Sequence, residues 1–340
     1  MQHHESMGKS MMSRDLVKKH YSYELLPEFL SFVAVNSRTR WPAASCLLTS
    51  DVAWRLPGSR PEKNLCFWYQ RDELIGYAWF DANGPCIIDQ RSSMSWDEGL
   101  ARAMLAWLES RRLTIKALVP WLIDIEYIEQ WEQALTDGVH LAEGTDKFLQ
   151  VAAFDTDVIK TKFLEDAGYA STQNFQFYLA RSLKDELPTS SLKHNWQLRH
   201  VLLADIEARV SVHRASWVRS NYQTAQYLLL RENIVYEPEL DIVLANDEGV
   251  FVSYCIGWVD YETGVGSFEP VGTTPEFRQQ GLGRAVNLEG LRRMKAMGMH
   301  SAKIGTPGFN GRAYALYRSC GFELVDRDRT FIKRLPRSNG

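Results

Sequence analysis

The fold of this chain is decided by the stretch Phe268-Glu-Pro-Val-Gly-Thr-Thr-Pro-Glu-Phe-Arg-Gln-Gln-Gly-Leu-Gly-Arg-Ala285, which predicts a strand that passes through a glycine-bearing loop into a helix. The first N–H groups of a helix lack intrahelical partners and the helix dipole adds partial positive charge there, so such a junction binds anions. Gly281 and Gly283 leave room for a pyrophosphate, and Arg278 and Arg284 flank the loop with cations that can bind its oxygens. The stretch therefore predicts a phosphate-binding loop.

The spacing of the glycines excludes two common nucleotide sites. A dinucleotide fingerprint needs a third glycine where Val286 stands, and a P-loop needs Gly-Lys-Ser/Thr, which this loop lacks. Residues 278–283, Arg-Gln-Gln-Gly-Leu-Gly, instead fit the pattern Arg/Gln-x-x-Gly-x-Gly/Ala, and here the sequence resembles the GCN5-related N-acetyltransferase (GNAT) family. Members of that family bind acetyl-coenzyme A on such a loop, so the resemblance implies acetyl-CoA as the cosubstrate.

The residues that follow the loop continue the resemblance. Apolar residues at helical spacing predict a helix over residues 285–297 that Gly298 ends, and a short strand follows at residues 301–305. A second helix, within residues 310–322, then leads to a final strand at residues 322–335. This order over roughly seventy residues matches the family, and such context confirms a short motif.

Composition limits the partners of the chain. Its 340 residues carry 39 basic and 42 acidic side chains, a net charge of −3 that gives no general attraction to nucleic acid or membranes. Five cysteines without a Cys-x-x-Cys pair favour free thiols in a reducing compartment and make a zinc site unexpected. We expect a cytoplasmic protein without a metal, in which residues 1–20 form a disordered leader.

Two domains are expected, because a polar stretch with Pro188 separates two halves of similar length. We predict an α/β (α+β) fold of two tandem GNAT-like domains, each a mixed, mostly antiparallel sheet flanked by helices. The boundaries are a degenerate domain at 21–186, a linker at 187–194 and a catalytic domain at 195–336. Further strands of the second domain are expected at 196–200, 241–245, 251–260 and 264–273, and helices at 205–217 and 223–232.

The N-terminal half repeats this order but lacks the loop. It shows a hairpin at 65–80, a helix at 96–111 and a helix-to-strand junction at 163–183, which indicates a duplication. Where the glycine loop belongs, residues 91–99 place bulky side chains, and Asp97 and Glu98 would repel a pyrophosphate. We therefore predict that this half binds no cofactor and walls part of the acceptor cleft, as in tandem members of the family such as mycothiol synthase-like proteins.

Acetyl transfer to an amine needs a base, because the ammonium must lose a proton before its nitrogen can attack a thioester. Strand alternation predicts Ser267, Glu269, Val271 and Thr273 on one face, which would direct Glu269 to the acceptor. The equally weighted alternative is that Glu269 is a structural strand residue that faces solvent or pairs with an arginine. Pro270 removes one backbone donor and indicates an edge, a bulge or a splayed strand.

The resemblance assigns the remaining site residues. Tyr317 stands where the family commonly carries a tyrosine that protonates the leaving thiolate, although the alternative is a core aromatic. Asn310 either bonds the cofactor arm or caps the helix that it begins. The cofactor contacts that the resemblance implies are Val271, Gly272, Thr273, Arg278, Gln279, Gln280, Gly281, Leu282, Gly283, Arg284 and Asn310. Three tyrosines lie in the region that covers the acceptor in the family: Tyr222, Tyr227 and Tyr236.

The resulting hypothesis is an acetyl-CoA-dependent N-acetyltransferase that moves acetyl directly to a primary amine of a small molecule. The alternative is a non-catalytic acyl-CoA sensor or scaffold that kept the loop. We expect no nucleic-acid or membrane partner, and a monomer or homodimer.

Overall fold

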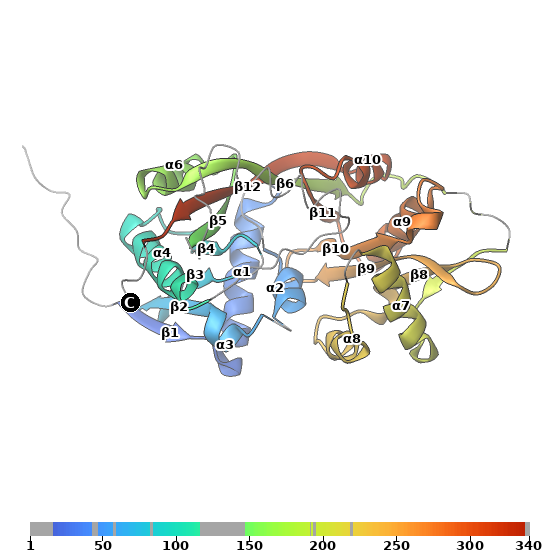
Figure 1. The fold of residues 1–340 in the computed structure, drawn as a ribbon, viewed down its shortest axis with the longest axis horizontal. Helices are drawn as coiled ribbons and strands as arrows, with labels where there is room; N and C mark the ends of the chain where they lie inside the picture. The colour runs from blue at the N-terminus through green and yellow to red at the C-terminus, as the bar shows by residue number, and fades with distance from the viewer. Residues whose placement is uncertain are drawn as a thin grey trace, which may run out of the picture.

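The structure is a computed structural model that describes residues 16–42, 47–56, 59–81, 84–115, 147–190, 192, 195–217 and 220–336. Its described elements form two sheets of four and eight strands with helices on their faces (Figure 1). The predicted α+β class is confirmed.

The N-terminal half supplies the first sheet, in the order β1-β2-β3-β4. Its elements are β1 Leu16–His20, η1 Tyr23–Leu25, α1 Leu26–Arg40, α2 Thr49–Arg55, α3 Pro61–Asn64, β2 Leu65–Gln70, β3 Glu73–Trp79, β4 Ile87–Gln90, α4 Glu98–Leu113, β5 Phe148–Phe154, α6 Val158–Asp166 and β6 Ala170–Ser182. The predicted hairpin and helix are confirmed. The prediction of a disordered leader is wrong for residues 16–20, because they pair with β2 as an edge strand; residues 1–15 lie outside the described residues.

The C-terminal half supplies most of the second sheet. Its elements are β7 Gln197–His200, η2 Leu203–Asp205, α7 Ile206–Ser216, α8 Thr224–Arg231, η3 Pro238–Leu240, β8 Asp241–Ala245, β9 Phe251–Asp260, β10 Val265–Thr273, η4 Pro275–Phe277, α9 Leu282–Ala296, β11 Ser301–Pro307, α10 Gly311–Ser319 and β12 Glu323–Arg334. Each strand and helix predicted for this half is present, with boundaries shifted by a few residues at most.

The two halves exchange their last strands. The second sheet runs β5-β12-β6-β11-β10-β9-β8-β7, so β6 of the first half lies between β11 and β12 of the second, and β12 lies between β5 and β6 of the first. Both strands therefore run from one half into the other, along the upper part of the molecule in Figure 1. The two halves therefore share the second sheet. Each of the strands β6 and β12 places its residues beside strands of the other half.

Apolar packing falls into separate clusters that match this arrangement. One cluster packs α9 and α10 against one face of the second sheet, and another packs α7 and α8 against the opposite face. The N-terminal half has a cluster under α1 and one under α4 that also includes Phe331 of β12. Burial of these faces fixes β10 between two helical layers.

Candidate acetyl-transfer site between diverging strands

The site begins where β10 and β11 separate. The two strands pair in parallel over Val265–Ser267 and Ser301–Lys303 only, whereas β11 stays paired with β6 up to Pro307. Beyond Ser267 the backbone groups that β10 directs towards β11 no longer meet that strand. This is the splayed strand that Pro270 indicated, and an extended ligand can add to such an opening as a strand does.

A bulge in β10 corrects the predicted side-chain pattern. Ser267 pairs with Trp258 of β9, but Val271 pairs with Cys255, because the register shifts between Phe268 and Val271. Residues that pair across an antiparallel ladder share a face, and Trp258 and Cys255 lie on opposite faces. The expectation that Ser267 shares a face with Val271 and Thr273 is therefore wrong. Val271 packs with the α9 cluster, whereas Ser267 faces the N-terminal half.

Glu269 lies inside this bulge. Its backbone carbonyl accepts a hydrogen bond of 2.7 Å from the indole Nε1 of Trp258, which fixes the main chain there. The side chain is half-buried, and this burial raises the pKa of its carboxyl to about 7; Asp51 also raises that pKa, and Arg55 opposes the rise. A carboxyl with a pKa near neutrality can both accept and release a proton at physiological pH.

The glycine loop leaves the first turn of α9 open. Gly281 is the N-cap residue with φ 78°, a left-handed conformation that favours glycine, and no side chain caps the helix. A Cβ at Gly281 would meet no atom within 4 Å, so the space in front of the helix is free. At Gly283 a Cβ would lie 3.1 Å from Leu316. Uncapped N–H groups beside open space fit a pyrophosphate of acetyl-CoA.

The arginines of the loop contact backbone carbonyls. Arg278 donates to the carbonyls of Thr273 and Ser216, both at 3.2 Å, and so ties the loop to β10 and α7. Arg284 donates to Ser319 at 3.2 Å and to Thr189 at 2.7 Å. Both side chains hold the loop in place.

The other predicted cofactor residues lie around the same opening. Gly272 cannot carry a Cβ, which would lie 2.5 Å from Tyr254, and the Thr273 hydroxyl is 2.9 Å from the Ser253 hydroxyl. Leu282 is buried with the α9 cluster. Gln280 donates weakly to Glu276, and Gln279 adopts a positive φ of 60°.

Tyr317 and Asn310 lie on and before α10. Tyr317 is 7% exposed beside Phe322, and burial, followed by the charge of Glu269, raises its pKa. Among the described residues its hydroxyl has no hydrogen-bond partner, so it is free to act on a ligand. Asn310 caps α10, because its Oδ1 accepts from the Ala313 N–H at 3.0 Å. That contact favours the capping alternative for Asn310.

The helix α2 of the N-terminal half packs on this part of the second sheet, and sequence reasoning missed it. The backbone N–H of Thr49 donates to Asp260 at 3.2 Å, and the hydroxyls of Ser50 and Ser267 lie 3.2 Å apart. Figure 1 shows α2 at the junction of the two halves. The N-terminal half thus contacts the second sheet beside the opening, and its predicted role as a wall of the acceptor cleft stays a prediction.

An ion pair strengthens that junction. Lys303 of β11 is buried and donates to Asp51 of α2 and to the hydroxyl of Tyr178 on β6. No motif surrounds these three residues, and they meet only because β6 has crossed into the second sheet. Their distance in the sequence explains why they were missed.

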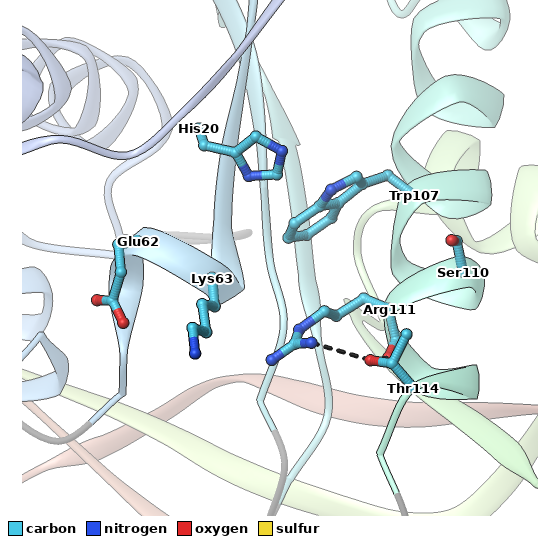
Figure 2. Close-up of a pocket in the computed structure, with 7 residues that line it drawn as sticks. All are labelled: His20, Glu62, Lys63, Trp107, Ser110, Arg111 and Thr114. Atoms are coloured by element: carbon cyan, nitrogen blue, oxygen red, sulfur yellow. Dashed lines mark hydrogen bonds between the residues drawn. The ribbon is translucent and has the colours of Figure 1, made fainter.

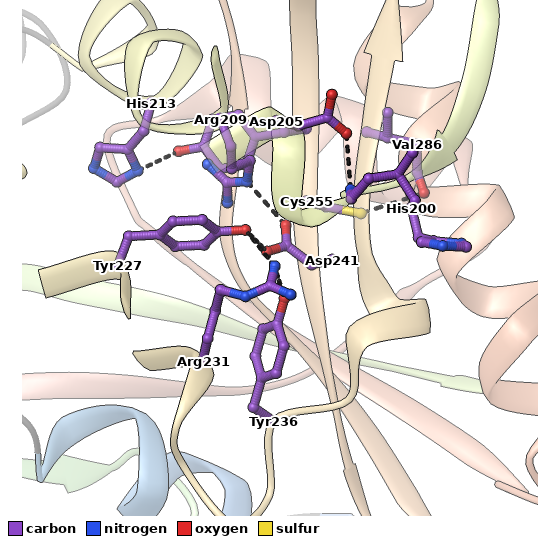
Figure 3. A network of polar contacts seen from close by, with 12 residues as sticks. His200, Asp205, Arg209, His213, Tyr227, Arg231, Tyr236, Asp241, Cys255 and Val286 are labelled. Carbon is purple, nitrogen blue, oxygen red and sulfur yellow. Dashed lines mark hydrogen bonds and ion pairs between the residues drawn. The ribbon is translucent and has the colours of Figure 1, made fainter. Parts of the chain in front are cut away.

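The tyrosines predicted to contact the acceptor belong to a structural network (Figure 3). Tyr227 and Tyr236 both donate to Asp241, at 2.6 and 3.0 Å, and Asp241 also pairs with the buried Arg209 at 2.9 Å. Tyr227 is fully buried. The expected acceptor contact is therefore wrong for Tyr227, whereas for the half-buried Tyr236 it stays a prediction. The buried carboxylate and guanidinium need hydrogen-bond partners, and the two tyrosines supply them.

His213 extends this network. Its Nδ1 lies 2.8 Å from the hydroxyl of Tyr254, and its ring packs on Tyr222 with 4.3 Å between centroids. Burial and then the charge of Arg209 lower the pKa of His213 to about 3, so it is neutral in the folded protein.

The matching region of the N-terminal half is filled by its own side chains. Asp97 caps α4 by accepting from the Leu100 N–H at 3.0 Å, so a carboxylate already occupies the helix N-terminus. The Lys160 ammonium donates to the carbonyl of Ile88 at 3.0 Å, and Asn36 donates to the carbonyl of Gln90 at 2.9 Å. These contacts saturate groups that a cofactor arm would need.

A cavity of about 360 Å³ lies elsewhere on the N-terminal half (Figure 2). It is lined by His20, Glu62, Lys63, Trp107, Ser110, Arg111 and Thr114. In the described part of the chain, no three His, Cys, Asp or Glu side chains are grouped as metal ligands, and no helix is long and apolar enough to cross a membrane.

Comparisons with known proteins agree with this geometry. Residues 207–322 match the model of the acetyltransferase (GNAT) family. The mycothiol acetyltransferase of Arthrobacter sp. (strain FB24) is 25% identical over 175 residues, which cover 47% of this chain and 53% of that protein. The enzyme of the same name from Saccharomonospora viridis is 39% identical over 64 residues, which cover 19% and 21%. The chain thus spans about half the length, or less, of these curated relatives.

Solved structures match over almost the whole chain. A GCN5-related N-acetyltransferase from Sphaerobacter thermophilus superposes with a TM-score of 0.62 at 16% identity, covering 94% of this chain and 95% of that one. A tandem GNAT protein from the clavulanic acid biosynthesis pathway superposes with a TM-score of 0.62 at 12% identity, covering 96% and 99%. At these identities the likeness shows the fold, which is that of tandem GNAT proteins.

Proposed function

This chain carries a GNAT acetyltransferase domain within a tandem GNAT fold, and from that premise we propose that it transfers an acetyl group from acetyl-CoA to a primary amine of a small molecule. The observation that carries the proposal is the opening between β10 and β11, which has Glu269 on one strand and the uncapped α9 at its end. The mycothiol acetyltransferase relatives favour a small-molecule acceptor.

Acetyl-CoA supplies the activated acetyl group, and the loop at Gly281 and Gly283 holds its pyrophosphate. The backbone groups of Val271, Gly272 and Thr273 that β11 leaves unpaired hold its arm, since β10 and β11 have already separated there. These contacts orient the thioester towards Glu269 and lower the entropic part of the barrier.

Glu269 accepts the proton that the acceptor ammonium loses, directly or through water. The amine nitrogen then forms a bond to the acetyl carbon while the carbon–sulfur bond breaks. Tyr317 donates its hydroxyl proton to the leaving sulfur, which makes free coenzyme A, and the second proton that the nitrogen loses on becoming an amide returns through water to the Tyr317 phenolate. Burial suits both groups, because it keeps a proton on Tyr317 and raises the pKa of Glu269 into the range of a useful base.

The proposal is tested by incubating the protein with acetyl-CoA and a panel of primary amines, and by measuring free thiol and acetylated product. Wild-type protein is expected to turn over at least one amine, and Glu269→Gln is expected to bind acetyl-CoA without turnover. If the wild-type protein binds acetyl-CoA but acetylates no amine, the enzyme hypothesis is wrong and the acyl-CoA sensor takes its place.

A further inference from the structure

One cation beside the acetyl-transfer site has no partner among the described residues. Arg55 is the last residue of α2, and its side chain is exposed. Among the described residues it makes neither a hydrogen bond nor an ion pair. The neighbouring cations are engaged: Lys303 pairs with Asp51, and Lys160 donates to the Ile88 carbonyl.

The position of Arg55 is fixed by the helix that carries it. One turn before Arg55, Asp51 is held by Lys303, and two residues before Arg55 the carbonyl of Ala53 accepts from Asn233 at 2.7 Å. Asn233 belongs to the C-terminal half, so α2 is tied to that half near both ends. A guanidinium on a fixed helix end is held ready for a ligand.

Two carboxyl groups lie within electrostatic reach of Arg55. Burial raises the pKa of Glu269 to about 7 and that of Asp328 on β12 to about 6. Arg55 opposes the rise at Glu269, and Lys160 and then Arg55 oppose the rise at Asp328. Asp328 Oδ1 is buried without a hydrogen-bond partner in the described structure. Arg55 therefore carries its charge on a helix at the junction of the two halves, where it acts on both carboxyl groups, and no described carboxylate is bound to it.

The face of the sheet identifies which reactant Arg55 meets. Ser267 and Lys303, which contact α2, are paired neighbours on one face, whereas Val271 packs on the opposite face with α9. The glycine loop and its phosphate site begin α9. Arg55 is thus carried by a helix that packs on the face away from the phosphate site.

We propose that Arg55 binds an anionic group of the amine acceptor, a carboxylate or a phosphate, while the amine of the same molecule faces Glu269. This inference rests on the proposed function and names the acceptor class: a small primary amine that carries an oxyanion. Guanidinium binds either oxyanion through two parallel hydrogen bonds, and a charged partner strengthens them. The N-terminal half then selects the acceptor for a reaction that the C-terminal half performs.

The test measures binding of matched amines to the coenzyme A-loaded full chain by calorimetry. The pairs are glucosamine 6-phosphate with glucosamine, O-phosphoethanolamine with ethanolamine, and β-alanine with propylamine. The phosphate pairs and the carboxylate pair distinguish the two oxyanions. We expect wild-type protein to bind at least one member that carries an oxyanion roughly 10-fold or more tighter than its counterpart without one, as a charge-assisted hydrogen bond provides.

Three variants complete the test. Arg55→Gln is expected to abolish the preference while leaving the Kd of acetyl-CoA unchanged, and Arg55→Lys to retain part of it. The control is Arg102→Gln, an exposed arginine of α4 paired with Glu98, which should keep the full preference. The inference is overturned if wild-type protein prefers no anionic member, or if Arg55→Gln weakens both members of a pair equally. Binding is measured without turnover, so neither result depends on whether the protein catalyses acetyl transfer.

Discussion

Asp97 and Gly281 hold corresponding places in the element order of the two halves: Asp97 is the N-cap residue of α4, which follows β4, and Gly281 is the N-cap residue of α9, which follows β10. Asp97 closes α4 with its carboxylate, 3.0 Å from the Leu100 N–H, whereas Gly281 leaves α9 uncapped. A helix N-terminus that already holds an anion repels a second one. Of these two helices, α9 is therefore the one whose N-terminus is available for a pyrophosphate.

This contrast predicts one acetyl-CoA site per chain. Gly281→Asp places a carboxylate where Asp97 stands in the other half, and we expect it to weaken acetyl-CoA binding by at least about 10-fold, since charge repulsion replaces hydrogen bonds. Calorimetric titration gives both the stoichiometry and the Kd.

The matched control for that variant is Gly249→Asp. Gly249 has φ 79° and Gly281 has φ 78°, and a Cβ at either meets no atom within 4 Å. Both variants introduce the same backbone strain and the same charge, but Gly249 lies in the β8–β9 turn. A stoichiometry of two, or equal weakening by the two variants, would contradict the assignment of the loop.

Glu269→Gln is expected to lower kcat by between about 10² and 10⁴, because a positioned general base contributes that much. Glutamine keeps the shape of the side chain and its place in the bulge, so the acetyl-CoA Kd should stay within a factor of about two. Steady-state kinetics with calorimetry separate the two effects. An unchanged kcat would assign Glu269 a structural role.

The pH profile follows from the raised pKa of Glu269. Its carboxylate is the active form of a base, so kcat/KM should be low below the pKa and rise with pH to a plateau, with a midpoint near 7. A glutamate of ordinary pKa would already have reached the plateau at pH 6. The rising limb should disappear in Glu269→Gln, and a limb that persists there would identify a different base.

Tyr317→Phe tests the acid. The ring packs beside Phe322, with 6.4 Å between centroids, and phenylalanine keeps that packing, so the thermal midpoint should change little. Loss of the hydroxyl should lower kcat by about 10²-fold, since the leaving sulfur must then take its proton from water. Tyr314→Phe on the same helix is the control. Equal losses in both variants would indicate disturbance of α10 rather than a missing acid.

The sequence predicted the C-terminal elements well because their signals are local. The boundaries of β8 and β9 agree with the prediction, and α9 begins at Leu282, three residues before the predicted Ala285. The earlier start reflects Gly281, whose positive φ begins the helix before its apolar periodicity is visible. Prediction failed inside β10, because alternation assumes a regular strand and the bulge at Pro270 shifts the register.

The partners supplied by the N-terminal half could not be predicted from the sequence. Asp51, Tyr178 and Lys303 carry no motif, and they meet through the exchange of β6 and β12, which depends on pairing between strands far apart in the chain. Local propensity and periodicity hold no information on such pairing. For the same reason the role of α2 became visible only with the sheet order.

The ion pair between Asp51 and Lys303 should stabilise the junction of the halves. The Lys303 side chain is 5% exposed and that of Asp51 is 19% exposed, so Asp51→Asn removes the counter-charge of a buried ammonium. Loss of one partner of a buried pair costs about 3 kcal/mol of unfolding free energy, whereas loss of an exposed pair costs less than about 1 kcal/mol. Denaturant unfolding of Asp51→Asn should therefore show a much larger loss than Asp166→Asn, whose pair with Lys162 is exposed.

The double variant Asp51→Asn, Lys303→Met isolates the interaction energy between the two side chains from the other effects of each substitution. If the charges act on each other, the double variant should be destabilised by less than the sum of the two single losses, because the second substitution removes the charge that the first left buried. Additive losses would show that Asp51 and Lys303 stabilise the protein independently. A large coupling energy together with a lowered kcat would show that the junction formed by α2 also positions Glu269 for catalysis.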